Sequence, residues 1–150
     1  MDQRPTSGEH ADIRLWLRLL YCASHIESAL QSRLTAEFGM SLARFDLLSQ
    51  LERAPTGLTM TELSRQMMVS NGATTSLVDR LAEDGLLARA PHPSDRRTTI
   101  IRLTEAGRER FLAIAQEHEG WVIDLLSGLS AEAKAELLSG LGALKQHLSA

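Results

Sequence analysis

The 150-residue sequence lacks several features that define other classes of protein. No apolar run reaches the ~18 residues of a membrane-spanning helix, and the polar stretch from Met1 to Asp12 does not resemble a signal peptide. A single cysteine, Cys22, excludes an internal disulfide framework and suits a reducing cytoplasm. We therefore expect a cytoplasmic protein that has no membrane partner.

Motifs for catalysis and metal binding are also missing. The sequence contains no Walker loop, no nucleophile elbow and no His-Glu-X-X-His pattern. His118 stands between Glu117 and Glu119, but adjacent residues diverge by about 100° around a helix and so do not share a face. The other histidines show no ligand spacing. The sequence therefore predicts no enzyme activity, no cofactor and no metal site.

An overall excess of positive charge is missing too, since the formal net charge is −3. The charge is unevenly distributed, however, because residues 86–110 carry six basic and three acidic side chains. A local positive field of this kind can engage phosphate groups even when the whole molecule is acidic. The distribution keeps nucleic acid among the expected partners.

Residues 59–85 have the pattern of a helix-turn-helix. Thr59 and Glu62 have capping-box spacing, which predicts the start of one helix. Ser70 is a good N-cap for a second helix, and Gly85 provides its C-terminal stop. In that second helix the apolar residues form one inward stripe, Leu77, Val78 and Leu81. A short polar helix of this kind can enter a major groove about 12 Å wide with its N-terminal residues against base edges.

A β-hairpin is expected directly after the second helix. Leu86–Ala90 and Thr98–Leu103 are strand-like, and the second is rich in β-branched residues. The tip between them, Pro91–Arg97, is long for a mere connection and ends in two adjacent arginines. Guanidinium groups there can follow phosphates or enter a narrow minor groove, and Asp95 could brace one of them. The alternative is a solvated hairpin that only packs on the helices, and the adjoining helix-turn-helix favours DNA binding.

Apolar helices are predicted on both sides of this region, over about residues 11–38 and 105–150. Ser41 and Ser130 are expected to cap further helices. The outer helices have wider apolar stripes than one core face needs, which predicts a second contact surface. Burial between two chains would give a two-fold dimer with recognition helices ~34 Å apart, and hence a palindromic operator. The alternative is that these helices complete a monomeric core.

We therefore predict a mainly α fold with a small β-hairpin wing in a single domain over residues 1–150. The winged helix-turn-helix is expected at about residues 41–103, flanked by N- and C-terminal dimerisation helices. The whole chain resembles the MarR (multiple-antibiotic-resistance regulator) family in its element order. The most specific segments are LTMTELSRQMMVSNGATTSLVDRLAEDGLLAR and PSDRRTTIIRLTEAG. The Asp-X-Arg of that family's wing falls on Asp95 and Arg97, and its Leu-Thr-X-X-Gly exit falls on Leu103, Thr104 and Gly107.

The resemblance implies an obligate dimer that binds its own promoter region and holds a small molecule between the dimerisation helices and the winged domain. By this likeness Arg97 would read the minor groove, and Arg96 would be a second backbone contact. Arg80 would contact phosphate or brace the recognition helix. The predicted DNA-binding residues are Ser70, Asn71, Thr74, Thr75, Ser76, Arg80, Asp95, Arg96 and Arg97.

A ligand site is predicted from two groups of residues. Arg14 and Arg18 lie four apart on the first helix with Trp16 between them, and Arg44, Phe45 and Asp46 are consecutive on the second. An aromatic carboxylate needs a guanidinium fork and an apolar slot, which these residues could supply. Family members with related first-helix sequences often respond to phenolic acids, their thioesters or urate. The alternative is that the arginines are solvated and Trp16 belongs to a dimer core.

The resemblance thus favours a repressor that a small aromatic or anionic ligand releases from a palindromic operator. One route for the release is an Asp46–Arg80 contact that the ligand would break; the alternative is that these residues never meet and the ligand acts through the dimer helices alone.

A redox-switched regulator that senses oxidant through Cys22 is the alternative to ligand release. Peroxide-sensing members of the family carry their cysteine about one turn earlier, roughly where Trp16 and Leu17 lie. A sensing thiol needs a depressed pKa and access, and a cysteine in an apolar stripe is more often packed. A third possibility is a winged-helix module that contacts protein through its hairpin, which the tip arginines disfavour.

Overall fold

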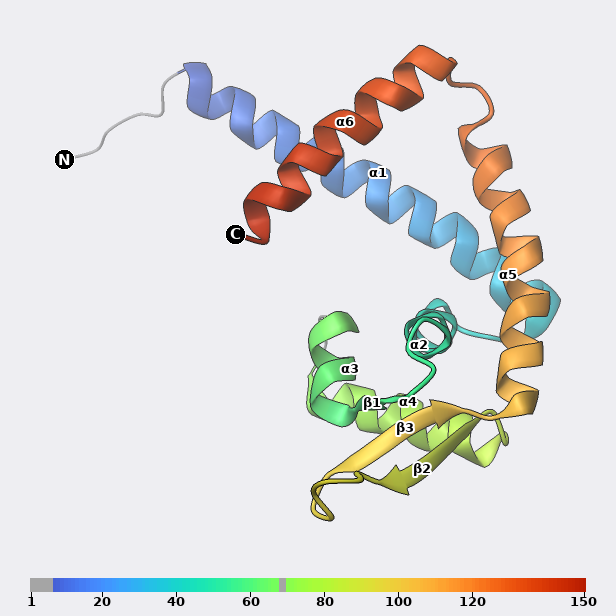
Figure 1. Ribbon diagram of the computed structural model, residues 1–150. Coiled ribbons are helices and arrows are strands. Elements are labelled where there is room, and N and C mark those ends of the chain that lie inside the picture. Colours follow the sequence, from blue (N-terminus) through green and yellow to red (C-terminus); the bar gives the residue numbers. More distant parts are fainter. Residues whose placement is uncertain (1–6, 68–69) are drawn as a thin grey trace. The chain divides into compact units, whose positions relative to one another are not determined.

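The computed structural model describes residues 7–67 and 70–150. Two compact units divide the chain, Met1–His118 and Glu119–Ala150. The order of elements is α1 (Ser7–Phe38), α2 (Leu42–Glu52), β1 (Leu58–Thr59), α3 (Met60–Met67), α4 (Asn71–Glu83), β2 (Leu87–Pro91), β3 (Thr99–Leu103), α5 (Glu105–Leu126) and α6 (Ala131–Leu148). The chain is therefore mainly helical with one small sheet, as the sequence predicts (Figure 1).

Local hydrogen bonds place the helix starts where the sequence predicts them. The hydroxyls of Ser41, Ser70 and Ser130 each accept a hydrogen bond from the backbone N–H three residues later, at 3.1–3.2 Å. The Thr59 N–H donates to Glu62 Oε2, and the Glu62 N–H donates to Thr59 Oγ1, each at 3.2 Å. These bonds satisfy amides that the first turn leaves without partners. The predicted caps and the predicted capping box are confirmed.

The sheet has one more strand than the sequence predicts. β1 pairs antiparallel with β3, with Leu58 opposite Ile101, and the strand order is β1-β3-β2. Gly57 precedes β1 with φ +90°, and a Cβ there would lie 2.8 Å from the carbonyl oxygen of Ile101. Only glycine lets the chain approach β3 this closely. A two-residue strand is too short to leave an alternating pattern, so the sequence predicts only the hairpin.

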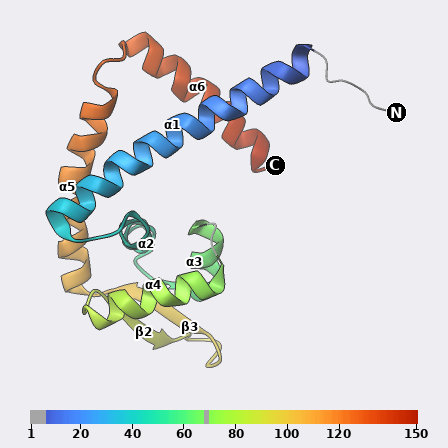
Figure 2. The same ribbon diagram turned by 180° about the vertical axis from the view of Figure 1, so that it is seen from behind.

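The core of the first unit lies where α2, α3 and α4 meet the sheet (Figures 1 and 2). Its fully buried apolar side chains include Leu47, Leu48, Leu51, Leu63, Val78, Leu81 and Ile101. Because these side chains come from every element of the helix-turn-helix and from the central strand, they hold the wing and the helices together.

The first turn of α5 is joined to the end of α4. The Thr104 N–H donates to the Leu86 carbonyl at 3.1 Å, and the Thr104 hydroxyl donates to the Gly85 carbonyl at 2.7 Å. The same hydroxyl accepts from the Gly107 N–H at 3.0 Å, which caps the helix. A Cβ at Gly107 would lie 2.0 Å from the Leu86 carbonyl oxygen. The Leu-Thr-X-X-Gly exit thus has a physical cause, because only glycine fits against this carbonyl.

Apolar side chains remain exposed outside the winged helix-turn-helix. α1 begins at Ser7, earlier than predicted, and its N-terminal half exposes Trp16 at 55% and Tyr21 at 69%. In the second unit, considered by itself, α6 has no buried residue. The exposed large apolar side chains of that unit are Ile123, Leu125, Leu129, Leu137, Leu138, Leu141 and Leu148.

In the part of the chain that the structure describes, no helix is long and apolar enough to cross a membrane.

Candidate nucleic-acid interface

The N-terminal half of α4 presents short polar side chains to solvent. Ser70, Asn71, Thr75 and Ser76 are exposed, so these predicted contact residues are accessible. The Ser70 hydroxyl is used as the N-cap, and the Thr75 hydroxyl donates to the Asn71 carbonyl at 2.8 Å. A hydroxyl whose proton is engaged in this way still has lone pairs that can accept a hydrogen bond. Thr75 is therefore best suited to accept from a donor on a base edge.

Thr74 is placed differently from its neighbours, and its predicted DNA contact is wrong. Its side chain is fully buried, on the same face of α4 as Val78. The hydroxyl donates to the Ser70 carbonyl at 3.0 Å and accepts from the Ser64 hydroxyl at 2.8 Å. Thr74 therefore joins α3 to α4 and has no surface to offer to DNA.

The C-terminal half of α4 carries acidic side chains that are offset by arginines. Arg80 forms an ion pair with Asp84 at 3.7 Å, one turn later on the same helix. Among residues 7–67 and 70–150, no ion pair joins Arg80 to Asp46. The structure thus has the alternative arrangement, in which Asp46 does not hold Arg80.

An ion pair between Asp79 and Arg89 joins the recognition helix to the wing. Asp79 lies on α4 and Arg89 lies on β2, and the guanidinium contacts the carboxylate directly. The contact holds the hairpin against α4 and also offsets a negative charge on the recognition helix. Sequence reasoning missed this pair. Its only signal was opposite charges on either side of the predicted stop at Gly85.

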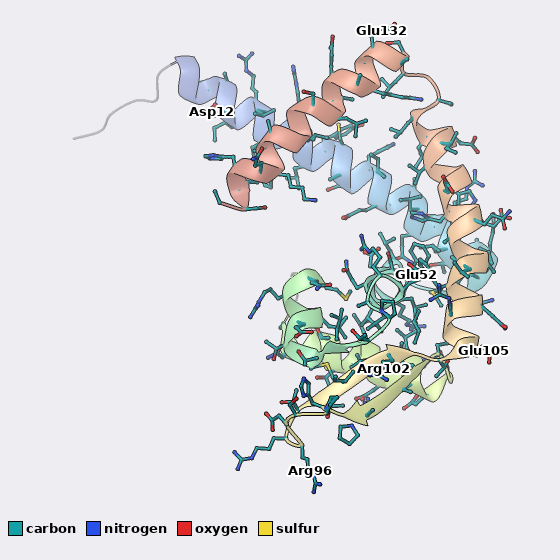
Figure 3. The ribbon with its side chains drawn as sticks, in the orientation of Figure 1. Asp12, Glu52, Arg96, Arg102, Glu105 and Glu132 are labelled. Atoms are coloured by element: carbon teal, nitrogen blue, oxygen red, sulfur yellow. The ribbon has the colours of Figure 1, made fainter. Side chains whose placement is uncertain are left out.

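Asp95 organises the backbone of the wing tip. Its carboxylate accepts from the Arg97 N–H at 3.0 Å and from the Thr98 hydroxyl at 3.1 Å. Asp95 therefore braces one of the two arginines, Arg97, as predicted, and does so through that residue's backbone N–H. Within the described residues, the guanidinium groups of Arg96 and Arg97 are exposed and form no ion pair or hydrogen bond. Figure 3 shows Arg96 at the tip of the hairpin, away from the helices.

The predicted ligand residues lie in different surroundings. Phe45 is buried in the packing between α2 and α5, with its ring centroid 5.4 Å from that of Phe111 and 4.7 Å from that of His118. It is a core residue. Burial in the same packing lowers the pKa of His118.

The other five predicted ligand residues remain in two groups. Arg14, Trp16 and Arg18 are exposed on α1, whereas Arg44 and Asp46 lie on α2. No hydrogen bond or ion pair joins the two groups within the described ranges 7–67 and 70–150. Partial burial raises the pKa of Asp46, and the nearby Glu27 carboxylate raises it further.

Two further expectations concern Cys22 and metal binding. Cys22 is exposed on α1, so it is not the packed residue that the apolar stripe predicts within one chain. Over the residues that the structure describes, no three His, Cys, Asp or Glu side chains are grouped to hold a metal ion. Neither observation adds a reactive centre to the interface formed by α4 and the wing.

Known proteins resemble the chain along most of its length. A sequence profile described as "MarR family" matches residues 38–98. The transcriptional regulator PecS of Dickeya dadantii is 34% identical, over 75% of this chain and 69% of its own.

The chain also superposes on solved structures of MarR family regulators. The crystal structure of a MarR family transcriptional regulator from Silicibacter pomeroyi superposes with a TM-score of 0.83 at 30% identity, covering 96% of this chain and 99% of that one. Sco3205 from Streptomyces coelicolor, solved in complex with DNA, has a TM-score of 0.83 at 24% identity and covers 99% of this chain and 93% of its own. At 24% identity, the second likeness concerns the fold alone.

Proposed function

The chain belongs to the MarR family of transcriptional regulators, and we propose that it binds a palindromic operator as a homodimer and represses transcription until a small ligand releases it. The observation that carries this proposal is the accessible polar face at the start of α4, together with two exposed arginines at the wing tip that form no ion pair within the described residues. The ion pair of Asp79 with Arg89 joins α4 to the wing, so that both elements would contact DNA together.

The charges along α4 support entry into the major groove by its N-terminal half. That half carries hydroxyl and amide side chains and no acidic residue, while Asp79 and Glu83 lie in the C-terminal half and Asp84 is the C-cap. Acidic groups near phosphates would repel the DNA, so the helix would approach with its N-terminus first. Arg96 and Arg97 would then contact phosphates or the adjacent minor groove.

The exposed apolar side chains support a dimer. Trp16 and its apolar neighbours on α1, and the leucines of the second unit, each leave a face without cover in one chain. Contiguous apolar surface of this extent marks an interaction site, and an obligate interface buries more than ~2,000 Å². A second copy of the chain, related by a two-fold axis, would supply the cover and position two recognition helices on one palindrome.

Release by a small aromatic or anionic ligand is the part of the proposal that rests most on the family. Arg14 and Arg18 lie one turn apart on α1 and are exposed, as is Trp16. The redox alternative has less support, because Cys22 lies in the middle of a long helix. A helix N-terminus is one of the positions that produce a reactive thiolate.

Fluorescence anisotropy tests the proposal, with labelled DNA from upstream of the chain's own gene and unlabelled nonspecific DNA as competitor. The variant Arg96→Ala/Arg97→Ala should bind more weakly, and the slope of log affinity against log salt should fall by about two. Arg53→Ala is the matched control, since Arg53 is an exposed arginine at the C-cap of α2 and belongs to neither α4 nor the wing tip. Equal binding to all DNA sequences, or equal losses in the variant and its control, would overturn the proposal.

A further inference from the structure

A cavity of about 250 Å³ lies outside both the DNA-facing surface and the predicted ligand residues. It lies between the end of α2, the turn that follows, and the junction of β3 with α5. Its lining residues are Leu51, Ala54, Pro55, Leu103, Thr104, Glu105 and Arg108. A water occupies about 30 Å³ in the liquid, so the cavity has room for about eight waters, or one ring with a short substituent.

We propose that this cavity binds a small organic cation with an apolar body, of the arylalkylamine class. The apolar part of the lining comes from Leu51, Ala54, Pro55 and Leu103. Leu51 is buried, Ala54 and Leu103 are partly buried, and Pro55 is exposed. Burial of the ligand's apolar surface against these residues would contribute a favourable, non-directional free energy of binding.

The charged groups at the cavity select a cation. Arg108 Nη2 lies 3.6 Å from Glu52 Oε1, so the arginine is already offset by a carboxylate. Glu105, at the start of α5, forms no ion pair within the described residues (Figure 3). Glu105 and Arg108 are the charged residues that line the cavity, and Arg108 is already paired with Glu52, which does not line it. The Glu105 carboxylate is therefore the charge left for a ligand, and it attracts an ammonium group and repels a carboxylate.

The hydroxyl of Thr104, a lining residue, connects the cavity to the recognition helix. The Thr104 hydroxyl donates to the Gly85 carbonyl and accepts from the Gly107 N–H, so its hydrogen bonds are engaged within the protein. Gly85 directly follows the C-cap of α4. A ligand seated against Thr104 would therefore press on the segment that joins α5 to the end of the recognition helix. This step rests on the proposed function, whereas binding itself does not.

Three probes that share a phenyl ring and differ in charge test the binding. Benzylamine, benzyl alcohol and benzoate are titrated into the full-length protein, and backbone amide signals are followed by NMR. Benzylamine should give saturable shifts at Ala54, Leu103 and Thr104, benzyl alcohol weaker shifts at the same residues, and benzoate the weakest. Benzoate binding there as tightly as benzylamine, or benzylamine shifts that map elsewhere, would overturn the proposal.

Glu105→Gln and Glu109→Gln form a matched pair of variants. Both residues are exposed on α5 and lie one turn apart, but only Glu105 lines the cavity. Glu105→Gln should weaken benzylamine binding by about two- to fivefold, as expected for one partly exposed charge, and Glu109→Gln should leave it unchanged. Equal losses in both variants would show attraction to the acidic surface in general and would contradict a site.

The effect on DNA is measured separately on the operator. Saturating benzylamine should weaken operator binding by a factor within the usual range for coupled sites, roughly 5–150. If benzylamine binds at the cavity and operator affinity is unchanged, the site stands and its regulatory role is overturned. If the protein binds no DNA specifically, the proposed function fails while the NMR result still decides the cavity.

Discussion

Thr74 and Thr75 are adjacent on α4 and have opposite roles. The Thr74 side chain is fully buried and bonded to Ser64, whereas the Thr75 side chain is exposed and bonded only within its own helix. A rotation of about 100° per residue carries one threonine into the core and its neighbour to the surface. At the scale of single residues, position on the helix therefore decides which hydroxyl serves stability and which is available to DNA.

Thr74→Val should reduce the free energy of unfolding by about 1–3 kcal/mol, because the buried Ser64 hydroxyl loses its acceptor. Urea denaturation measures the change, and Thr75→Val is the control, expected to stay within about 0.5 kcal/mol. The two substitutions should have the opposite order of effect on operator binding, where Thr75→Val should lower the affinity more than Thr74→Val does. Equal destabilisation by both substitutions would contradict the assigned roles.

Gly107→Ala should destabilise the protein by about 1–3 kcal/mol or more, because the added methyl group would meet the Leu86 carbonyl oxygen at 2.0 Å. Gly120→Ala on the same helix is the matched control, since a Cβ there meets nothing within 4 Å. That control should stabilise the helix by about 0.5–1 kcal/mol. Thermal denaturation should therefore move the two melting temperatures in opposite directions. A shift in the same direction would count against the close approach at Leu86.

At the scale of elements, two contacts set the geometry of the winged helix-turn-helix. Arg89 on β2 joins the wing to Asp79 on α4, and Thr104 joins the start of α5 to the end of α4. The first contact spans the turn after α4, and the second spans the whole β2–β3 hairpin. The helix and the wing can then present their DNA-facing groups at a constant separation.

The Asp79–Arg89 pair is tested by a double-mutant cycle in operator binding. Arg89→Gln should weaken binding about two- to fivefold, and adding Asp79→Asn should cost nothing further, because the pair is already broken. If Arg89 instead contacts a phosphate directly, Asp79→Asn alone would strengthen binding and the two effects would simply add. Additivity within error would therefore rule out a positioning role.

The packing of α2 on α5 should make stability depend on pH through His118. Burial lowers its pKa in the folded state below the ordinary value of 6.5, so the unfolded chain binds a proton more readily. Stability should therefore fall as pH decreases through the range just below about 6.5. His118→Gln should flatten this dependence in urea denaturation measured between about pH 7 and 5. An unchanged slope in the variant would assign the dependence to other groups.

At the scale of the whole molecule, apolar surface exceeds what one chain covers. The N-terminal half of α1 and the second unit both expose large apolar side chains. Each is more apolar than an ordinary surface helix needs to be. This excess is the physical reason to expect a second chain.

The wild-type protein should remain a dimer at nanomolar concentration in sedimentation experiments, because separating obligate-sized apolar interfaces is unfavourable. Trp16→Glu should produce a helical 16.5 kDa monomer, since Trp16 is exposed within one chain and the charge would be buried only in the dimer. Ser28→Glu, at an exposed polar position of the same helix, is the control. A folded 16.5 kDa wild-type monomer would contradict the proposed assembly.

The sequence by itself determined the starts of α2, α3, α4 and α6, the helix-turn-helix and the hairpin. Ser41, Ser70 and Ser130 cap their helices through bonds to residues only three positions away, so short segments contain the whole signal. The exposed arginines of the wing were visible for the same reason, because a polar tip between two strands is a local pattern.

Only the tertiary structure decided which residues meet across the chain. It buried Thr74 against Ser64, paired Arg89 with Asp79 and placed Phe45 in the core. It also added β1 to the sheet and formed the cavity between the end of α2 and the start of α5. These features depend on contacts between residues that are distant in sequence, and such contacts are set by packing, which no local pattern of residue types encodes.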